Sequence, residues 1–259
     1  MLKVRVIPTL LWKTVGLVKG VGFTSWRRVG PVLPAIKVYD ARDVDELLLV
    51  DITATQQGAE PDCTSVSGFA DECFVPFTVG GGVKSVEQIQ RLLRAGADKV
   101  AINTAAYGSP HLVEQACGRF GAQCVVASID ARRHGDGTYH CYSHCGTVAT
   151  SERPDVWARE LEKRGAGEIL ITSIDRDGTM EGYDLELIRQ VVGAVNLPVI
   201  ASGGAGNYEH MRQAIQEAGA SAVAAASLFH FTEQTPAGAK KHLAAAGVPI
   251  RASYRLPGG

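Results

Sequence analysis

The 259-residue chain predicts an α/β fold of the (β/α)8 barrel type, also called a TIM barrel. Short apolar runs alternate with segments of helical periodicity, which is the pattern of a parallel sheet covered by helices. Several runs are apolar throughout, as expected of strands that are buried on both faces. Similar stretches also recur at about half the chain length. We therefore expect one barrel domain, residues 1–259, built from two half-barrel repeats.

The first half predicts four strands and three helices. The expected strands are residues 5–11, 46–52, 75–79 and 98–103. The expected helices are residues 31–44, 62–73 and 86–95. Ser85 precedes the last of these helices as an N-terminal cap, and Gly96 follows it as a stop. The polar, glycine-containing segment 13–22 predicts a loop.

The second half continues with the same alternation. Its expected strands are residues 124–130, 168–173, 197–202 and 222–227. Its expected helices are residues 155–164, 185–192, 208–218 and 237–246. Eight strands that alternate with helices in about 250 residues are typical of the eight strand–helix units of a closed barrel. An open doubly wound sheet is the alternative, but no G-x-G-x-x-G motif follows the first strand.

The repeat is clearest at two strands that end in glycines. Gly80-Gly81-Gly82 corresponds to Ser202-Gly203-Gly204 at an offset of 202 − 80 = 122 residues. Residues 93–100 resemble residues 216–223 at an offset of 216 − 93 = 123. Functional groups of such barrels gather at the carboxyl ends of the strands. The two glycine segments are therefore expected on opposite sides of the barrel mouth.

Small polar residues accompany the glycines at this expected mouth. Bare glycine N–H groups and nearby helix N-termini suit phosphate oxygens. The alternative is that the glycines only form tight turns between strands and helices. The candidate phosphate-binding residues are Gly81, Gly82, Asn103, Thr104, Asp177, Gly178, Gly203, Gly204, Ala226 and Ser227. Two matching sites favour a small-molecule substrate with a phosphate at each end.

The composition excludes several classes of function. The chain carries 26 basic and 27 acidic residues, so its net charge of −1 offers no broad attraction for nucleic acid or an anionic membrane. No apolar run is long enough to span a bilayer, and Lys3 and Arg5 interrupt the start of the chain, where a signal peptide would be apolar. We expect a cytoplasmic protein with reduced cysteines and no cofactor.

Two weaker features remain open in the sequence. The segment His140-Cys141-Tyr142-Ser143-His144-Cys145 has the residue types of a metal site in an expected loop after the fifth strand. Its spacing is not that of a standard zinc site and no second ligand pair is near it, so we predict no metal. Asp51 ends the second strand, where it either orients a substrate or bonds a neighbouring loop.

Longer motifs throughout the chain resemble a known family. They are FTVGGG at 77–82, AGADKV at 95–100, INTAA at 102–106, GAGEIL at 165–170, TSIDRDGT at 172–179 and IASGGAG at 200–206. These stretches resemble the cyclase subunit of imidazole glycerol phosphate synthase, the HisF family. The resemblance implies a barrel that receives ammonia from a glutaminase partner of the HisH type. It also implies a bis-phosphorylated ribonucleotide substrate, converted in histidine biosynthesis to imidazole glycerol phosphate and an aminoimidazole carboxamide ribotide.

The resemblance assigns catalytic positions and reveals one departure. The family has an aspartate at the end of the first strand and another at the end of the fifth; Asp130 matches the second, and Lys19 matches a lysine of the family's lid. Leu11 occupies the first position, and leucine cannot transfer a proton. Two functions therefore stay open. One is a synthase with Asp130 as its acid–base group. The other is a cyclase-deficient paralogue that channels ammonia to a sugar-amidating enzyme in surface-polysaccharide biosynthesis.

Four charged residues lie near strand starts at the opposite end of the expected barrel: Arg5, Glu46, Lys99 and Glu168. Charges inside a barrel are costly unless they are paired, so two acids and two bases predict a neutral ring. The alternative is four separately solvated charges. All four match the family's salt-bridge gate over an ammonia tunnel, and Asp98 matches a family position that contacts the glutaminase. The resemblance thus implies a gate and a docking face.

Overall fold

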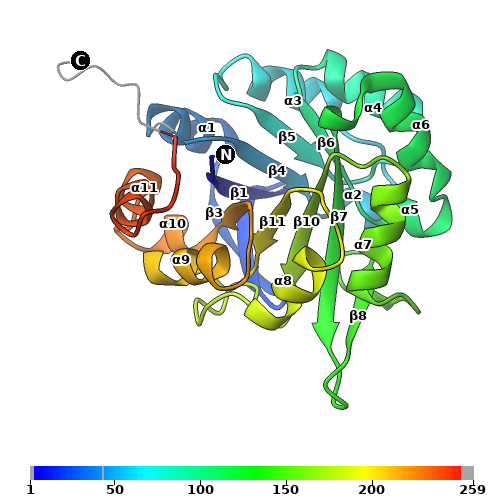
Figure 1. The fold of residues 1–259 in the computed structure, drawn as a ribbon. Coiled ribbons are helices and arrows are strands. Elements are labelled where there is room, and N and C mark those ends of the chain that lie inside the picture. The colour runs from blue at the N-terminus through cyan, green and yellow to red at the C-terminus, as the bar shows by residue number, and fades with distance from the viewer. Residues whose placement is uncertain (1–2, 43, 252–259) are drawn as a thin grey trace.

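The computed structural model describes residues 3–42 and 44–251, which form a closed parallel barrel surrounded by helices (Figure 1). In order around the barrel, its strands are β1 (Arg5–Lys13), β4 (Leu47–Asp51), β5 (Phe77–Gly80), β6 (Lys99–Ile102), β7 (Val125–Arg133), β10 (Glu168–Ser173), β11 (Val199–Ser202) and β12 (Ala222–Ala225). The parallel pairing of β12 with β1 closes the ring. The predicted barrel is therefore confirmed, and the open doubly wound sheet is excluded.

Helices connect the strands and cover the outside of the barrel (Figure 1). They are α1 (Val32–Ala41), α2 (Ala54–Gln57), α3 (Cys63–Ala70), α4 (Val86–Arg94), α5 (Thr104–Gly108), α6 (His111–Phe120), a 3-10 turn (Ala122–Cys124), α7 (Pro154–Lys163), α8 (Leu185–Val192), α9 (Tyr208–Gln216), α10 (Ser227–Phe231) and α11 (Pro236–Ala245). The predicted cap of α4 is present, because the Ser85 hydroxyl accepts the Gln88 N–H at 3.3 Å. Four helices were not predicted from the sequence: α2, α5 and α10, which are short, and α6, which has no side-chain N-cap.

Two apolar layers explain why the barrel strands are apolar throughout. Along β1, Val6 and Leu10 face outward and pack with the helices, whereas Ile7 faces the barrel axis. The axial cluster consists of Ile7, Leu48, Ala101, Val126, Leu170, Ile200, Ala222 and Ala224. Its residues come from seven different strands. They form a packed layer across the barrel interior, between the amino-terminal ends of the strands, here called the lower end, and their carboxyl ends, here called the upper end.

The loop predicted at residues 13–22 is wrong. Strand β1 continues to Lys13, and the chain then forms β2 (Gly16–Val21) and β3 (Thr24–Gly30), an antiparallel extension of the sheet that we call the lid hairpin. Four consecutive residues of β2, from Leu17 to Gly20, are buried. They lack the alternation of a half-buried strand, and their glycines and lysine are typical of a loop, which explains the error.

The segment His140–Cys145 is not mainly a loop either. Strand β8 (Tyr139–Ser143) pairs antiparallel with β7 and then with β9 (Val148–Ala149). Only its end turns, at His144 and Cys145, whose φ angles are 51° and 55°. Among the described residues no group of three or more His, Cys, Asp or Glu is placed to hold a metal ion.

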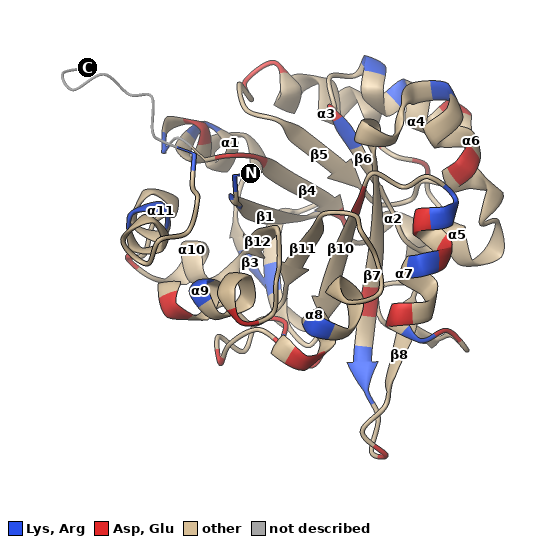
Figure 2. Cartoon of the chain, in the orientation of Figure 1, with Lys and Arg blue, Asp and Glu red and all other residues tan. Residues whose placement is uncertain are grey.

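The outer surface is charged but mixed in sign. Lys and Arg, and Asp and Glu, are spread over the outer helices (Figure 2), in agreement with the net charge of −1. Within residues 3–42 and 44–251, no helix combines the length and apolar character that a membrane crossing requires. The six cysteines all lie in the described part of the chain and are unpaired thiols.

Candidate functional site

A cavity opens at the carboxyl ends of the barrel strands, with about 1210 Å³ of empty space including its open mouth. The cavity is lined by Asp130 and by all the other residues predicted for the mouth: Lys19, Gly81, Gly82, Asn103, Thr104, Asp177, Gly178, Gly203, Gly204, Ala226 and Ser227. The fold therefore brings together residues that are up to 208 positions apart in the chain (227 − 19). Their roles in binding stay predictions.

The two glycine turns have similar backbone geometry at Gly81 and Gly203. Gly81 and Gly203 have φ angles of 108° and 89°, which side chains rarely adopt. A Cβ at Gly203 would lie 2.6 Å from the Ser173 carbonyl oxygen, and one at Gly81 would clash with the Asp51 carbonyl oxygen. Asp51 and Ser173 are separated by the repeat distance, 173 − 51 = 122. Each half thus needs glycine at the same close approach between neighbouring strand ends.

Asp130 is the carboxylate best placed for proton transfer. It projects from β7 into the cavity, and its Oδ2 accepts the Asn103 side-chain N–H at 2.7 Å. Burial and the nearby Asp177 carboxylate raise the pKa of Asp130 to about 7, although the Asn103 hydrogen bond opposes this. A carboxyl group with such a pKa can both release and accept a proton near neutral pH.

The lid hairpin closes over the mouth through Lys19. Its Nζ lies 2.6 Å from an Asp177 carboxylate oxygen, and the lysine is only 2% exposed. Burial raises the pKa of Asp177, while the Lys19 charge opposes that rise. The backbone N–H of Gly22 also donates to the Asp177 carbonyl at 2.8 Å. Two bonds to one residue therefore hold the hairpin against the loop that follows β10.

Leu11 occupies the position that corresponds to Asp130. In β1, Leu11 lies opposite Val50 of β4. In β7, Asp130 lies opposite Thr172 of β10. Val50 and Thr172 are related by the repeat, since 172 − 50 = 122. The register thus places leucine and aspartate at equivalent points of the two half-barrels, both lining the cavity.

Asp51 lies beside this apolar part of the cavity and bonds its own loop. Its Oδ1 accepts the backbone N–H of Thr53 at 2.8 Å, the Thr53 hydroxyl at 2.7 Å and the Ala54 N–H at 3.1 Å. The loop-bonding alternative is therefore confirmed. Asp51 also lines the cavity, so a role in orienting a ligand stays a prediction.

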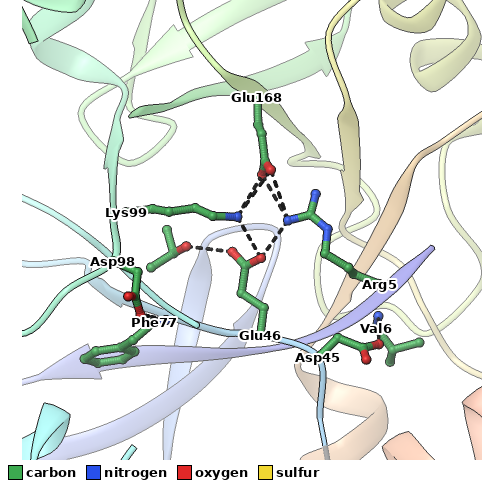
Figure 3. A network of polar contacts seen from close by, with 9 residues as sticks. Arg5, Val6, Asp45, Glu46, Phe77, Asp98, Lys99 and Glu168 are labelled. Atoms are coloured by element: carbon green, nitrogen blue, oxygen red, sulfur yellow. Dashed lines mark hydrogen bonds and ion pairs between the residues drawn. The ribbon is translucent and has the colours of Figure 1, made fainter. Parts of the chain in front are cut away.

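The four charges at the lower end form the predicted ring (Figure 3). One Glu46 oxygen lies 2.6 Å from Arg5 and 2.9 Å from Lys99. Glu168 lies 3.1 Å from Arg5 and 3.2 Å from Lys99. Glu46, at 2% exposure, also accepts the Thr78 hydroxyl at 2.6 Å. The alternative of four separately solvated charges is wrong, and the ring lies at the amino-terminal ends of the barrel strands.

Comparison with known proteins identifies the family. The sequence family described as "Histidine biosynthesis protein" matches residues 5–235. A relative from Hyphomonas neptunium (strain ATCC 15444), "Imidazole glycerol phosphate synthase subunit HisF", is 51% identical over 251 residues. These cover 97% of this chain and 99% of the relative. The chain belongs to the HisF family. The family resemblance seen in the motifs is therefore confirmed.

Several residues that line the cavity of this HisF-family chain were not selected from the sequence. They include Phe23 and Trp26 of the lid hairpin and Cys145 of the β8–β9 turn. A Cβ at Gly146 would lie 2.9 Å from the Phe23 ring, so this ring packs directly on the β8–β9 turn. The two aromatic residues were the available signal, but no element was predicted for residues 23–30, so nothing in the sequence placed these rings at the mouth.

Proposed function

We propose that this chain is the cyclase-type subunit of an imidazole glycerol phosphate synthase and acts in the cytoplasm with a HisH-type glutaminase. In this role it is a carbon–nitrogen lyase that consumes ammonia and a bis-phosphorylated ribonucleotide. The observation that carries the proposal is the Asp130–Asn103 pair, held between two matching glycine turns in a HisF-family barrel. The HisF relative is named as a synthase subunit, which supports both the reaction and a partner subunit.

The two phosphates of the substrate are assigned to the two halves of the mouth. One binds at Gly81 and Gly82 with Asn103 and Thr104 nearby, and the second binds at Gly203 and Gly204. Gly178, Ala226 and Ser227 complete the second group in the same cavity. Backbone N–H groups in such turns and at helix starts attract phosphate oxygens. Lys19 adds a positive charge that Asp177 holds at the mouth.

Asp130 acts between these ends as the acid–base group. Ammonia attacks a substrate carbonyl, the ribotide leaves and a ring closes, and each step moves a proton. A pKa of about 7 lets Asp130 take a proton from the attacking nitrogen and return it to a leaving group. Asn103 fixes one carboxylate oxygen, which leaves the other available to the reacting atoms.

Ammonia enters from the opposite end, through the ring of Arg5, Glu46, Lys99 and Glu168. The glutaminase docks on this lower face, where the exposed Asp98 lies next in sequence to Lys99. Asp98 is fixed by the Phe77 N–H, which donates to its Oδ2 at 2.8 Å. The support is geometric, because the four ring residues lie together at or next to the starts of their strands (Figure 3), whereas the cavity lies at the carboxyl ends of the strands.

The test is turnover of the bis-phosphorylated ribonucleotide by the purified chain with ammonium chloride as the nitrogen source. We expect measurable formation of imidazole glycerol phosphate and a loss of about 10²–10⁴-fold in Asp130→Asn. Absence of turnover by a folded wild-type chain that binds the ribonucleotide would contradict the proposed reaction.

Leu11 favours a second candidate function. With an apolar residue opposite Asp130, the chain binds the phosphorylated ligand but channels ammonia to a separate sugar-amidating enzyme of surface-polysaccharide biosynthesis. Wild-type turnover close to that of a HisF chain with aspartate at this position would exclude this candidate. Glutaminase activation without cyclase turnover, together with ammonia-dependent amidation by an added sugar-amidating enzyme, would support it.

A further inference from the structure

The two halves of the barrel carry matching antiparallel extensions at the mouth. In the first half, β1 pairs with β2 and β2 with β3, which forms the lid hairpin. In the second half, β7 pairs with β8 and β8 with β9 in the same antiparallel order. Leu11 and its counterpart Asp130 both belong to the paired parts of these extensions. The β8–β9 turn, residues 144–147, is therefore the counterpart of the lid-hairpin turn at residues 22–23.

Both turns hold residues with side chains in left-handed backbone. The φ angle is 63° at Phe23 in the lid hairpin, and it is 51° and 55° at His144 and Cys145. In the described part of the chain, only Ser25 and Met180 also combine a side chain with a positive φ. Such backbone costs free energy and gathers at ligand clamps and switch segments. Because Phe23 and Cys145 also line the cavity, both turns belong to its mouth.

Each turn reaches across the mouth to a loop of the opposite half. The lid hairpin extends from β1 to the loop after β10, where a Cβ at Gly22 would lie 3.8 Å from the Ile174 carbonyl oxygen. The β8–β9 turn extends from β7 to the loop after β4, where the Cys145 thiol donates to the Ile52 carbonyl oxygen at 3.2 Å. The two isoleucines are separated by the repeat distance, 174 − 52 = 122. The two turns therefore brace the mouth from opposite sides in the same manner.

The two turns also touch each other. A Cβ at Gly146 would lie 2.9 Å from the Phe23 ring and 3.3 Å from the Ile174 side chain. Glycine at this position leaves room for the ring and adopts the required φ of 76°. The turn is also tied to the first half of the mouth, because the His144 N–H donates to the Thr104 hydroxyl at 2.9 Å. A hydroxyl that accepts one hydrogen bond can still donate its own hydrogen, so Thr104 can bind a phosphate and the turn together.

We propose that the β8–β9 turn is a second lid, which closes against the lid hairpin at the contact between Phe23 and Gly146. A ligand enters or leaves when this contact opens, and each lid is held by the half of the mouth across from it. The inference rests on the proposed function for its ligand, a bis-phosphorylated ribonucleotide. Phe23 and Gly146 are positioning residues, because they act by keeping the two lids together.

The first test is hydrogen–deuterium exchange of the ligand-free chain, resolved by peptide mass spectrometry. Phe23→Ala should speed exchange of residues 144–147 about fivefold, because these residues lose their contact with the ring. Phe23→Leu, which keeps an apolar side chain, should restore most of the protection. Val15→Ala is the control, since Val15 lies in the turn between β1 and β2 and is 60% exposed. An equal effect of Phe23→Ala and Val15→Ala on residues 144–147 would overturn the inference.

A reciprocal variant tests the contact from the second lid. Gly146→Ala places a Cβ 2.9 Å from the Phe23 ring, and it should speed exchange of residues 22–26 about fivefold. Gly137→Ala is the matched control, because Gly137 is also left-handed, with a φ of 85°. Among the described residues, a Cβ at Gly137 would meet only an Arg133 nitrogen, at 3.8 Å. If both variants change residues 22–26 equally, backbone strain alone explains the effect and the inference fails.

Release of the ribonucleotide separates the lids from the reaction. Trp26 lines the cavity, so release can be followed by stopped-flow tryptophan fluorescence. Phe23→Ala and Gly146→Ala should each raise the release rate about fivefold. The double variant should raise it no further, because both changes remove one contact. Independent effects that multiply in the double variant would contradict the inference. If the ribonucleotide does not bind but exchange of the two turns is coupled, the proposed function fails and the second lid stands.

Discussion

Replacing Asp130 with asparagine should make the stability of the chain less dependent on pH. The folded-state pKa of about 7 lies above the ordinary value of 3.8 because the carboxylate is buried near Asp177. A raised aspartate pKa contributes stability below the unfolded pKa, and that contribution disappears as pH rises through the folded pKa. Asparagine does not titrate and still offers an oxygen to the Asn103 N–H, so Asp130→Asn removes this loss.

The size of the effect follows from the two pKa values. With 3.8 unfolded and about 7 folded, at about 1.4 kcal/mol per pH unit, wild type loses about 2–3 kcal/mol relative to the variant between pH 5 and pH 8. For a chain of this size that is a relative gain of about 5–10 °C in melting temperature for Asp130→Asn. Thermal unfolding followed by circular dichroism at both pH values measures it.

A matched control is Asp136→Asn. Asp136 lies in the exposed turn between β7 and β8, where hydrogen bonds from Thr138 lower its pKa. A lowered pKa stabilises the ionised form, so this control should show no relative gain at pH 8. If Asp130→Asn and wild type differ by the same amount at pH 5 and pH 8, Asp130 does not titrate between them and its assignment as a neutral-pH acid–base group is wrong.

Three further predictions concern the ring, the mouth and the turns. Lys99→Met leaves Glu46 and Glu168 with Arg5 as their shared cation. Glutamine-dependent turnover should therefore fall relative to turnover with free ammonia. If the ratio of these two rates is the same in the variant as in wild type, the ring is not a gate. Leu11→Asp should raise cyclase turnover at least about tenfold, whereas Leu11→Asn, which cannot transfer a proton, should not. Gly203→Ala should destabilise the chain by more than about 1 kcal/mol in urea unfolding, because its Cβ would lie 2.6 Å from the Ser173 carbonyl oxygen. Gly68→Ala, in α3 with open space around it, should instead stabilise by about 0.5–1 kcal/mol.

The barrel could be predicted because its signals are local and repeated. Apolar runs, the Ser85 cap and the glycine stops act within a few residues, and the glycine-ended strand occurs twice, at residues 80–82 and 202–204. The lid hairpin could not be predicted, because burial of β2 comes from contacts with distant loops. Lys19, for example, is buried in an ion pair with the Asp177 carboxylate, which lies 158 positions later in the chain.

The site residues at the strand ends were predicted, whereas those of the lid hairpin, apart from Lys19, were not. Residues at strand ends, such as Asn103 and Asp130, could be placed because barrel topology fixes where strand ends meet. The proximity of Phe23 and Trp26 to the cavity depends on the hairpin, so no strand-end rule could place them.

The register that sets Leu11 against Asp130 has a consequence for ligand orientation. A mouth with two identical halves would bind a ligand with two similar ends equally well in either direction. Here one half presents Leu11 and Val50 where the other presents Asp130 and Thr172. A polar centre turned toward Leu11 would lose a hydrogen bond, at a cost of about 1–3 kcal/mol. The two directions would then differ about tenfold to a hundredfold in occupancy, so the side chains that break the symmetry of the duplicated barrel also tell the two ends of its ligand apart.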